Sequence, residues 1–144
     1  MEEEGGMMDI EEIGKLREEC ERYGLSGREL FGKYDADSIR FVCNGIGPSW
    51  MPDVLRSFVS TMNPSLEPVA AIHDMRYDIG GTEEDFLAAN AEFEENGVRI
   101  AKAKFGWWNL RRYLVIAQAK KFRALCDKFG KPAFRFEAKS GGAG

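Results

Sequence analysis

Hydrophobic positions recur at the spacing of an α-helix along most of this chain. Between residues 9 and 23 they step by three or four, with charged side chains between them, which predicts an amphipathic helix. A second helical pattern begins at Pro68 and ends at Gly80. Because proline fits the first turn of a helix and glycine commonly ends one, this segment is also predicted to be helical.

Two further helical patterns follow. Thr82, with Asp85 three residues later, is the predicted N-cap of a helix that ends near residues 96–97. Residues 98–105 are expected to add only a broken turn. From residue 107 to about 128 apolar residues lie on more than one side of a predicted long helix, so we expect most of it to be buried. Because the link after Gly80 is short, the helices on its two sides are expected to be antiparallel neighbours.

The remaining segments are less regular. Ser26 and Glu29 have the spacing of a capping box before a short helical turn. Residues 35–38 are expected to form a loop and residues 39–42 an extended lead-in. Residues 43–48, CNGIGP, contain two glycines that let the backbone curl and bring several carbonyl oxygens together. An all-α fold is predicted, with an N-terminal helix and loop (1–38), a main helical domain (39–130) and a flexible C-terminal tail (131–144).

Length and cysteine content set limits on the class of protein. The 144 residues suffice for one domain with its own core. Cys20, Cys43 and Cys126 lack zinc-site spacing and are odd in number, so buried thiols in a reducing compartment are expected. The longest apolar run of the carboxyl half, 114–117, is too short to span a membrane, and the first residues are acidic, unlike a signal peptide. We expect synthesis in the cytoplasm, followed by association with a particle or release by a non-classical route.

Charge is distributed unevenly along the sequence. The net charge is −4, but residues 1–98 carry 8 basic and 22 acidic side chains, whereas residues 99–144 carry 12 basic and 2 acidic ones. Two interpretations follow. The halves attract each other within the fold, or the basic half faces an anionic surface.

The only histidine of the chain, His73, is followed directly by Asp74. On a helix His73 and Tyr77 share one face, while Asp74 is rotated by about 100° toward another neighbour. A lone histidine of this kind is most often a buried residue satisfied by a neighbour. Alternatively, the Asp74 carboxylate and the carbonyls of the glycine loop are hard ligands that suit calcium. A cation beside His73 would then favour ester hydrolysis by an activated water, which agrees with the absence of a GxSxG or phosphate-loop motif.

These motifs carry a family resemblance. Residues 43–48, followed by the His73-Asp74-Met75-Arg76-Tyr77 segment, resemble the YxGxG calcium loop and HDxxY helix of the phospholipase A2 superfamily, especially its disulfide-poor parvoviral, phage and bacterial members. Residues 89–93 stand where that family has Ala-Asp-x-x-Phe, and the similarity covers about residues 41–95. The resemblance implies two antiparallel active-site helices, a glycine-rich calcium loop and Ca²⁺-dependent hydrolysis of the sn-2 ester of glycerophospholipids. The alternative is a catalytically silent structural or interaction module, for instance of a virus or phage particle.

The resemblance also implies roles for individual residues. His73 would be the general base, oriented by Asn90, to which Tyr77 would also hydrogen-bond. The expected calcium ligands are the Asp74 carboxylate and the carbonyls of Cys43, Gly45 and Gly47, and the Gly45 amide would also help hold the oxyanion. Asn90 stands where the family has aspartate, which keeps the orientation of the histidine but predicts a weaker base.

A second candidate surface lies in the carboxyl half. Aromatic and basic side chains occur together there, as in proteins that bind anionic lipid headgroups. Core packing is the favoured interpretation of this segment, a membrane interface comes second and nucleic acid last, so no nucleic-acid partner is expected. The phospholipase resemblance implies a phospholipid membrane surface as the partner. The residues concerned are Trp107, Trp108, Arg111, Arg112, Lys120, Lys121 and Arg123.

Overall fold

The structure is a computed structural model that describes residues 9–43 and 53–137. These contain α-helices, short 3₁₀ turns and no strand beyond one isolated bridge between Gly81 and Phe136, so the all-α prediction is confirmed for this part of the chain. The helices are α1 (Ile10–Arg22), α2 (Ala36–Val42), α3 (Asp53–Ser60), α4 (Glu67–Ile79), α5 (Glu83–Lys104) and α6 (Leu110–Phe129). The 3₁₀ turns are η1 (Arg28–Gly32), η2 (Pro64–Leu66) and η3 (Lys131–Ala133).

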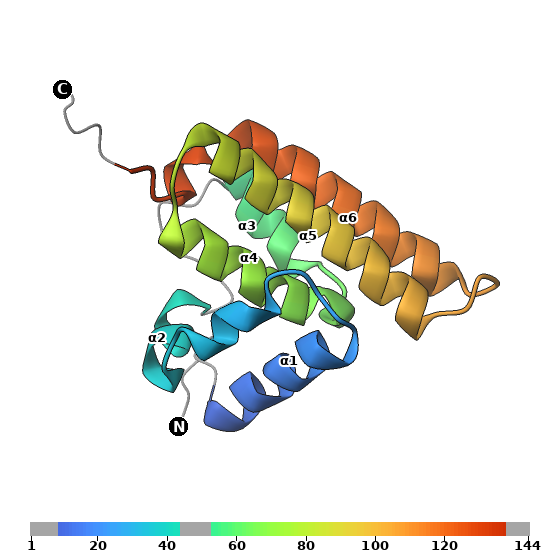
Figure 1. The fold of residues 1–144 in the computed structure, drawn as a ribbon. Helices are drawn as coiled ribbons and strands as arrows, with labels where there is room; N and C mark the ends of the chain where they lie inside the picture. Colours follow the sequence, from blue (N-terminus) through green and yellow to red (C-terminus); the bar gives the residue numbers. More distant parts are fainter. Residues whose placement is uncertain (1–8, 44–52, 138–144) are drawn as a thin grey trace.

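Helix α4 occupies the centre of the fold (Figure 1). The long α5–α6 hairpin packs against one side of it, and α1 and α2 pack against the other. Helix α3 lies on α6. The far end of the hairpin projects beyond the other helices (Figure 1).

Helix α1 forms where the sequence predicts it. Asp9 and Glu12 make a reciprocal capping box at its start, which satisfies two backbone donors. Ile13, Leu16 and Cys20 form its buried side. The amphipathic pattern and the local cap therefore agree, and together they place this helix against α4.

Residues 35–42 differ from the prediction. The Asp35 side chain accepts a hydrogen bond from the Ser38 backbone and starts α2, so the expected loop and extended lead-in are helical instead. The expected capping box at Ser26 is also wrong. Gly27, with φ 90°, precedes η1, while the Ser26 hydroxyl donates to Glu92 of α5 at 2.7 Å. The start of α2 thus rests on a local cap, whereas the Ser26 contact joins residues 66 positions apart, which a short sequence window does not contain.

Helix α5 does not end at residues 96–97 as predicted. Asn96 is buried, and its amide bonds the backbone N–H and C=O of Ser26. Gly97 faces α6 so closely that a Cβ there would lie 2.5 Å from that of Ala119. The Asn-Gly pair, a stop signal in isolation, is instead used inside the helix for close packing. The expected broken turn at 98–105 is consequently part of α5.

The last helix is less buried than predicted. Asn109 caps α6 by accepting from the Arg111 backbone, so Trp107 and Trp108 lie in the preceding turn and are exposed. Leu110 and Leu114 are also exposed. The buried side of α6 consists of Val115, Ala119, Phe122 and Cys126.

Residues 131–137 are packed, although the sequence predicts them to be part of a flexible tail. Phe134 is buried against Tyr77 and Phe86, and Gly81 exchanges backbone hydrogen bonds with Arg135 and Glu137. These contacts cover the end of α4 and the start of α5. Residues 138–144 lie outside the described part of the chain.

The cysteines and charges complete the fold. Cys20, Cys43 and Cys126 are free and buried, as predicted. Within the described residues no helix is long and apolar enough to cross a membrane. The acidic and basic halves meet in ion pairs, which supports attraction within the fold for part of the basic segment. These pairs are Lys120–Glu94, Arg123–Glu94, Lys131–Glu83 and Arg135–Asp78.

Candidate functional site

The contact between α4 and α5 brings three of the predicted site residues together. His73 Nε2 lies 2.9 Å from Asn90 Oδ1, and the Tyr77 hydroxyl donates to the same oxygen at 2.6 Å. His73 and Tyr77 lie on one side of α4, as their spacing of four requires. The short link between the helices turns α5 back so that Asn90 faces both residues.

Aromatic rings enclose the histidine. The ring centroids of Tyr77, Phe93 and Phe122 lie 4.3, 5.4 and 5.4 Å from that of His73. His73 is only 4% exposed. These contacts from α4, α5 and α6 hold the imidazole in one orientation and keep bulk water away from most of it.

This enclosure sets the protonation state of His73. Burial lowers the pKa of His73 to about 4, although the hydrogen bond to the Asn90 amide oxygen acts in the opposite direction. Desolvation disfavours the charged imidazolium. At neutral pH the ring is therefore uncharged, which is the form that can accept a proton.

Sequence reasoning missed one residue of this cluster, Asp127 of α6. Its Oδ1 accepts a hydrogen bond from Asn90 Nδ2 at 2.8 Å, and its Oδ2 lies 3.5 Å from Arg123 Nε. The available signal was its position: it is one of only two acidic residues in the segment 99–144.

Asp74 points away from this cluster, as its position next to His73 on a helix requires. Burial raises the pKa of the Asp74 carboxyl to about 7. No hydrogen-bond donor or cationic side chain pairs with this carboxylate among the residues described in 9–43 and 53–137. A partly buried carboxylate without a counter-charge is a chemically suitable ligand for a hard cation.

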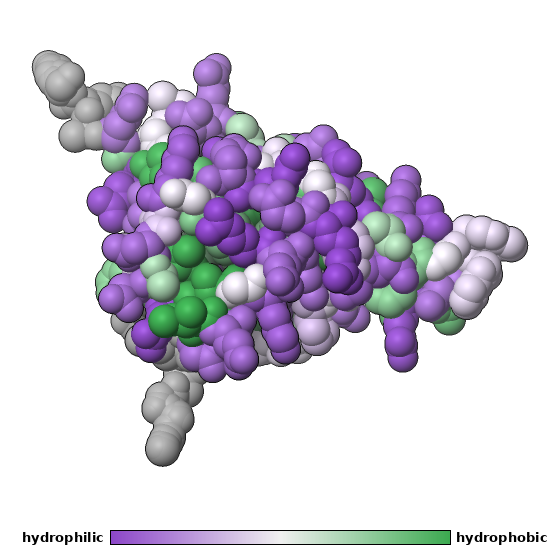
Figure 2. All heavy atoms as spheres, turned by 60° about the horizontal axis from the view of Figure 1, so that its bottom comes forward, coloured by the Kyte–Doolittle hydropathy of each residue, from purple (hydrophilic) through white to green (hydrophobic). Residues whose placement is uncertain are grey.

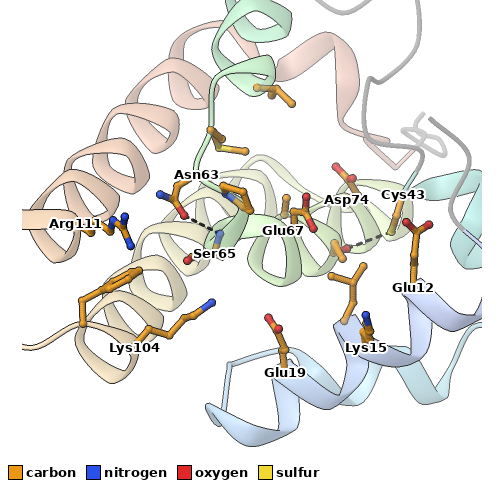
Figure 3. Close-up of a pocket in the computed structure, with 17 residues that line it drawn as sticks. Glu12, Lys15, Glu19, Cys43, Asn63, Ser65, Glu67, Asp74, Lys104 and Arg111 are labelled. Atoms are coloured by element: carbon orange, nitrogen blue, oxygen red, sulfur yellow. Dashed lines mark hydrogen bonds between the residues drawn. The ribbon is translucent and has the colours of Figure 1, made fainter. Parts of the chain in front are cut away.

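Asp74 lies at one end of a hollow of about 850 Å³. Cys43 and Glu12 lie near the same end, and Lys104 and Arg111 lie at the other (Figure 3). Asn63, Ser65, Glu67 and Glu19 lie between these ends (Figure 3). The lining also includes apolar side chains: Leu16, Val59, Met62, Ala70 and Phe105. The hollow thus has a mixed lining, with the Asp74 carboxylate at one end and basic side chains at the other.

The predicted calcium ligands are only partly within the described residues. Cys43 and Asp74 line the same hollow, and the buried Cys43 thiol donates to the Ala71 carbonyl at 3.5 Å. Gly45 and Gly47 lie outside the described residues. In the part that is described, no three His, Cys, Asp or Glu side chains cluster as a metal site. Asp74 lines the hollow and His73 does not, so the imidazole and the Asp74 carboxylate face different sides of α4.

Comparisons with known proteins add no relative: no family model, no curated protein and no solved structure matches this chain. The chemistry of the site must therefore be argued from its residues alone.

Proposed function

We propose that this protein is a calcium-dependent hydrolase that cleaves the sn-2 ester of glycerophospholipids. The observation that carries the proposal is the hydrogen-bonded set His73–Asn90–Tyr77, followed in the sequence by Asp74, a partly buried carboxylate for which the described residues offer no counter-charge. This combination supplies a neutral base held in one orientation and an anionic ligand one residue away. Neither group is required to stabilise an ion pair within the described part of the fold.

In the proposed reaction His73 removes a proton from a water molecule, which then attacks the ester carbonyl. Asn90 and Tyr77 hold the imidazole so that one ring nitrogen keeps its orientation throughout. Ca²⁺, when bound by Asp74 and the backbone carbonyls of Cys43, Gly45 and Gly47, would supply positive charge near the developing oxyanion. The Gly45 amide is the further proposed donor to that oxyanion.

The hollow beside Asp74 supports a lipid as the substrate class. Its lining includes Leu16, Val59 and Met62, which can contact a hydrocarbon chain. Arg111 and Lys104 at the far end carry the charge that attracts a phosphate or an anionic headgroup. An amphiphile with an apolar chain and an anionic group matches this distribution.

The tip of the α5–α6 hairpin supports a membrane surface as the partner. Trp107, Trp108, Leu110 and Leu114 are 74, 71, 78 and 62% exposed. No acidic residue occurs between positions 96 and 126, whereas eight basic ones do. In Figure 2 the tip is the right-hand end of the molecule, where pale and green side chains emerge among purple ones. Exposed tryptophans flanked by cations are typical of elements that enter the headgroup region of a bilayer.

Not every predicted basic residue contributes to this tip. Lys120 and Arg123 both pair with Glu94 of α5, so their charge is partly used within the fold. Arg111, Arg112 and the two tryptophans remain as the proposed lipid-contacting group. Nucleic acid is not proposed as a partner.

The direct test is release of fatty acid from phospholipid vesicles, with millimolar Ca²⁺ or with a chelator. We expect release by the wild type only with Ca²⁺, and none by His73→Gln at unchanged helical circular dichroism. Chelator-resistant release, or His73→Gln activity within a few-fold of the wild type, would contradict the proposal.

A second candidate function is a catalytically silent structural or interaction module. The observation that favours it is the near-complete burial of His73 among aromatic rings, an arrangement that a structural histidine also adopts. The two candidates differ in the same assay. A silent module releases no fatty acid under any condition. In that case the effect of His73→Gln is a lower melting temperature, because there is no hydrolysis rate to change.

A further inference from the structure

The hydrogen bond between Asn90 and Asp127 fixes which way the Asn90 amide points. An amide has a donor end and an acceptor end, whereas a carboxylate only accepts. Nδ2 must therefore face Asp127, which it does at 2.8 Å. The amide oxygen is then directed toward His73 and Tyr77, at 2.9 and 2.6 Å.

This orientation determines the tautomer of His73. Because Asn90 Oδ1 can only accept, His73 Nε2 must carry a proton and donate it. A neutral imidazole has one ring N–H, so the free lone pair is on Nδ1. If the amide were reversed, Nδ2 would face Nε2 and the proton would be held on Nδ1. The tautomer of the single histidine thus depends on a group that does not touch it.

We propose that Asp127 is a positioning residue that acts through Asn90 to hold His73 in the Nε2–H tautomer, with Nδ1 free to accept a proton. The carboxylate of Asp127 also polarises the Asn90 amide, which increases the negative charge on its oxygen. An aspartate at position 90 would place a negative charge directly beside His73. In this chain Asp127 supplies part of that effect through the Asn90 amide. The catalytic consequence rests on the proposed function, but the effect on the tautomer does not.

Neither Arg123 nor water can replace the Asp127 carboxylate as the acceptor for Asn90 Nδ2. Arg123 is its ion-pair partner, and Arg123 also bonds Glu94 at 3.0 Å. Asn90 is completely buried, so water is a poor substitute for the acceptor. Removing Asp127 therefore leaves Nδ2 without its partner, and the two amide orientations become similar in energy.

The test uses the fact that the chain has one histidine. A protein labelled with ¹⁵N-histidine gives one imidazole spectrum, in which the protonated and lone-pair nitrogens are distinguished directly. We expect pure Nε2–H in the wild type at pH 7. Asp127→Asn retains an acceptor oxygen and should keep this tautomer, whereas Asp127→Leu lacks it and should give a mixture or Nδ1–H. Arg123→Gln is the matched control, because it removes the ion pair but keeps the carboxylate, and it should resemble the wild type.

Two results would overturn the inference: Nδ1–H in the wild type, or pure Nε2–H in a folded Asp127→Leu protein. Should Asp127→Leu fail to fold, Asp127→Ala is measured in the same way and decides the outcome by the same criterion. Parallel vesicle assays separate the two proposals. A tautomer that follows Asp127 without any hydrolysis refutes the proposed function alone, whereas hydrolysis with an unchanged tautomer in Asp127→Leu refutes the positioning role alone. If both hold, Asp127→Leu lowers kcat by roughly tenfold or more with KM unchanged.

Discussion

At the residue scale, the chemistry of this protein depends on how one buried imidazole is surrounded. From the sequence, the HDxxY spacing and the helix that follows predict that His73, Tyr77 and Asn90 meet, and their hydrogen bonds are present in the structure. The sequence shows Asp127 as a lone acidic residue in a basic segment but does not place it beside Asn90, because it comes from α6, 37 residues after Asn90. Pairings of this length depend on the packing of helices, which local patterns do not specify.

The presence of Asp127 determines how an Asn90→Asp substitution should affect the stability of the fold. The new carboxylate would lie against that of Asp127, where the amide now donates at 2.8 Å. We expect a loss of about 1–3 kcal/mol in the free energy of unfolding. Adding Asp127→Asn restores a donor–acceptor pair, so the double variant should be more stable than Asn90→Asp. Urea unfolding of all four proteins gives the coupling energy, and simple additivity would argue against the contact.

His73 and Asp74 should make opposite contributions to stability as pH changes. The pKa of His73 is lowered to about 4 in the fold, so below about pH 6.5 the unfolded chain binds the extra proton and stability falls. The pKa of Asp74 is raised to about 7, so the folded chain binds the proton first and stability rises as pH falls from 7 toward 4.

Single substitutions separate these two contributions. Between pH 6.5 and 4, we expect the wild type to lose stability relative to His73→Gln and to gain it relative to Asp74→Asn. Each slope has an upper limit of about 1.4 kcal/mol per pH unit. Denaturant unfolding at several pH values measures both differences, and slopes of the same sign would contradict the assigned burial.

At the element scale, the sequence predicts the start of a helix where an N-terminal signal and an amphipathic or apolar pattern occur together. Helix α1 has a capping box and an amphipathic face, and α4 and α5 start where proline and Thr82 indicate. The end of α5 was misjudged because Asn96-Gly97 is a stop signal only when nothing packs on it. In this fold Ser26 bonds Asn96 and Ala119 packs on Gly97, so the helix continues. The exposed start of α6 was missed because its apolar residues suggested core.

Gly97 and Gly14 provide a matched test of this packing. A Cβ at Gly97 would lie 2.5 Å from that of Ala119, whereas one at Gly14 in α1 would meet nothing within 4 Å. Gly97→Ala should therefore destabilise the protein by about 1–3 kcal/mol, and Gly14→Ala should stabilise it by about 0.5–1 kcal/mol. Thermal unfolding compares them. Adding Ala119→Gly should recover part of the loss at Gly97, and no recovery would mean that the close approach of α5 and α6 is not its cause.

At the scale of the whole molecule, exposed tryptophans and basic side chains occur together at the tip of the α5–α6 hairpin. The ion pairs between α5 and α6 use some of the basic side chains, while the hairpin tip keeps Arg111 and Arg112 beside exposed tryptophans. The hollow with Lys104 and Arg111 at one end extends from this region to Asp74 (Figure 3). Membrane contact and substrate entry would therefore occur on connected parts of the surface.

Reversing charge at the tip should weaken binding to lipid. For Arg111→Glu with Arg112→Glu, we expect at least a tenfold loss of affinity for anionic vesicles and little change for zwitterionic ones, since each cation near an anionic membrane is worth about 1 kcal/mol. Vesicle co-sedimentation measures both. Arg22→Glu with Lys33→Glu makes the same change in net charge away from the tip and is the control. Equal loss in the two double variants would show an effect of net charge only.

The most direct measurement for the central claim is release of the sn-2 chain, relative to the sn-1 chain, from positionally labelled phospholipid at pH 8. At that pH Asp74, with its pKa of about 7, is ionised and His73 is neutral. We predict Ca²⁺-dependent release of the sn-2 chain alone, abolished by His73→Gln and by Asp74→Asn while both variants stay folded. Release of both chains, release that persists in either variant, or no release at any Ca²⁺ concentration would contradict the account.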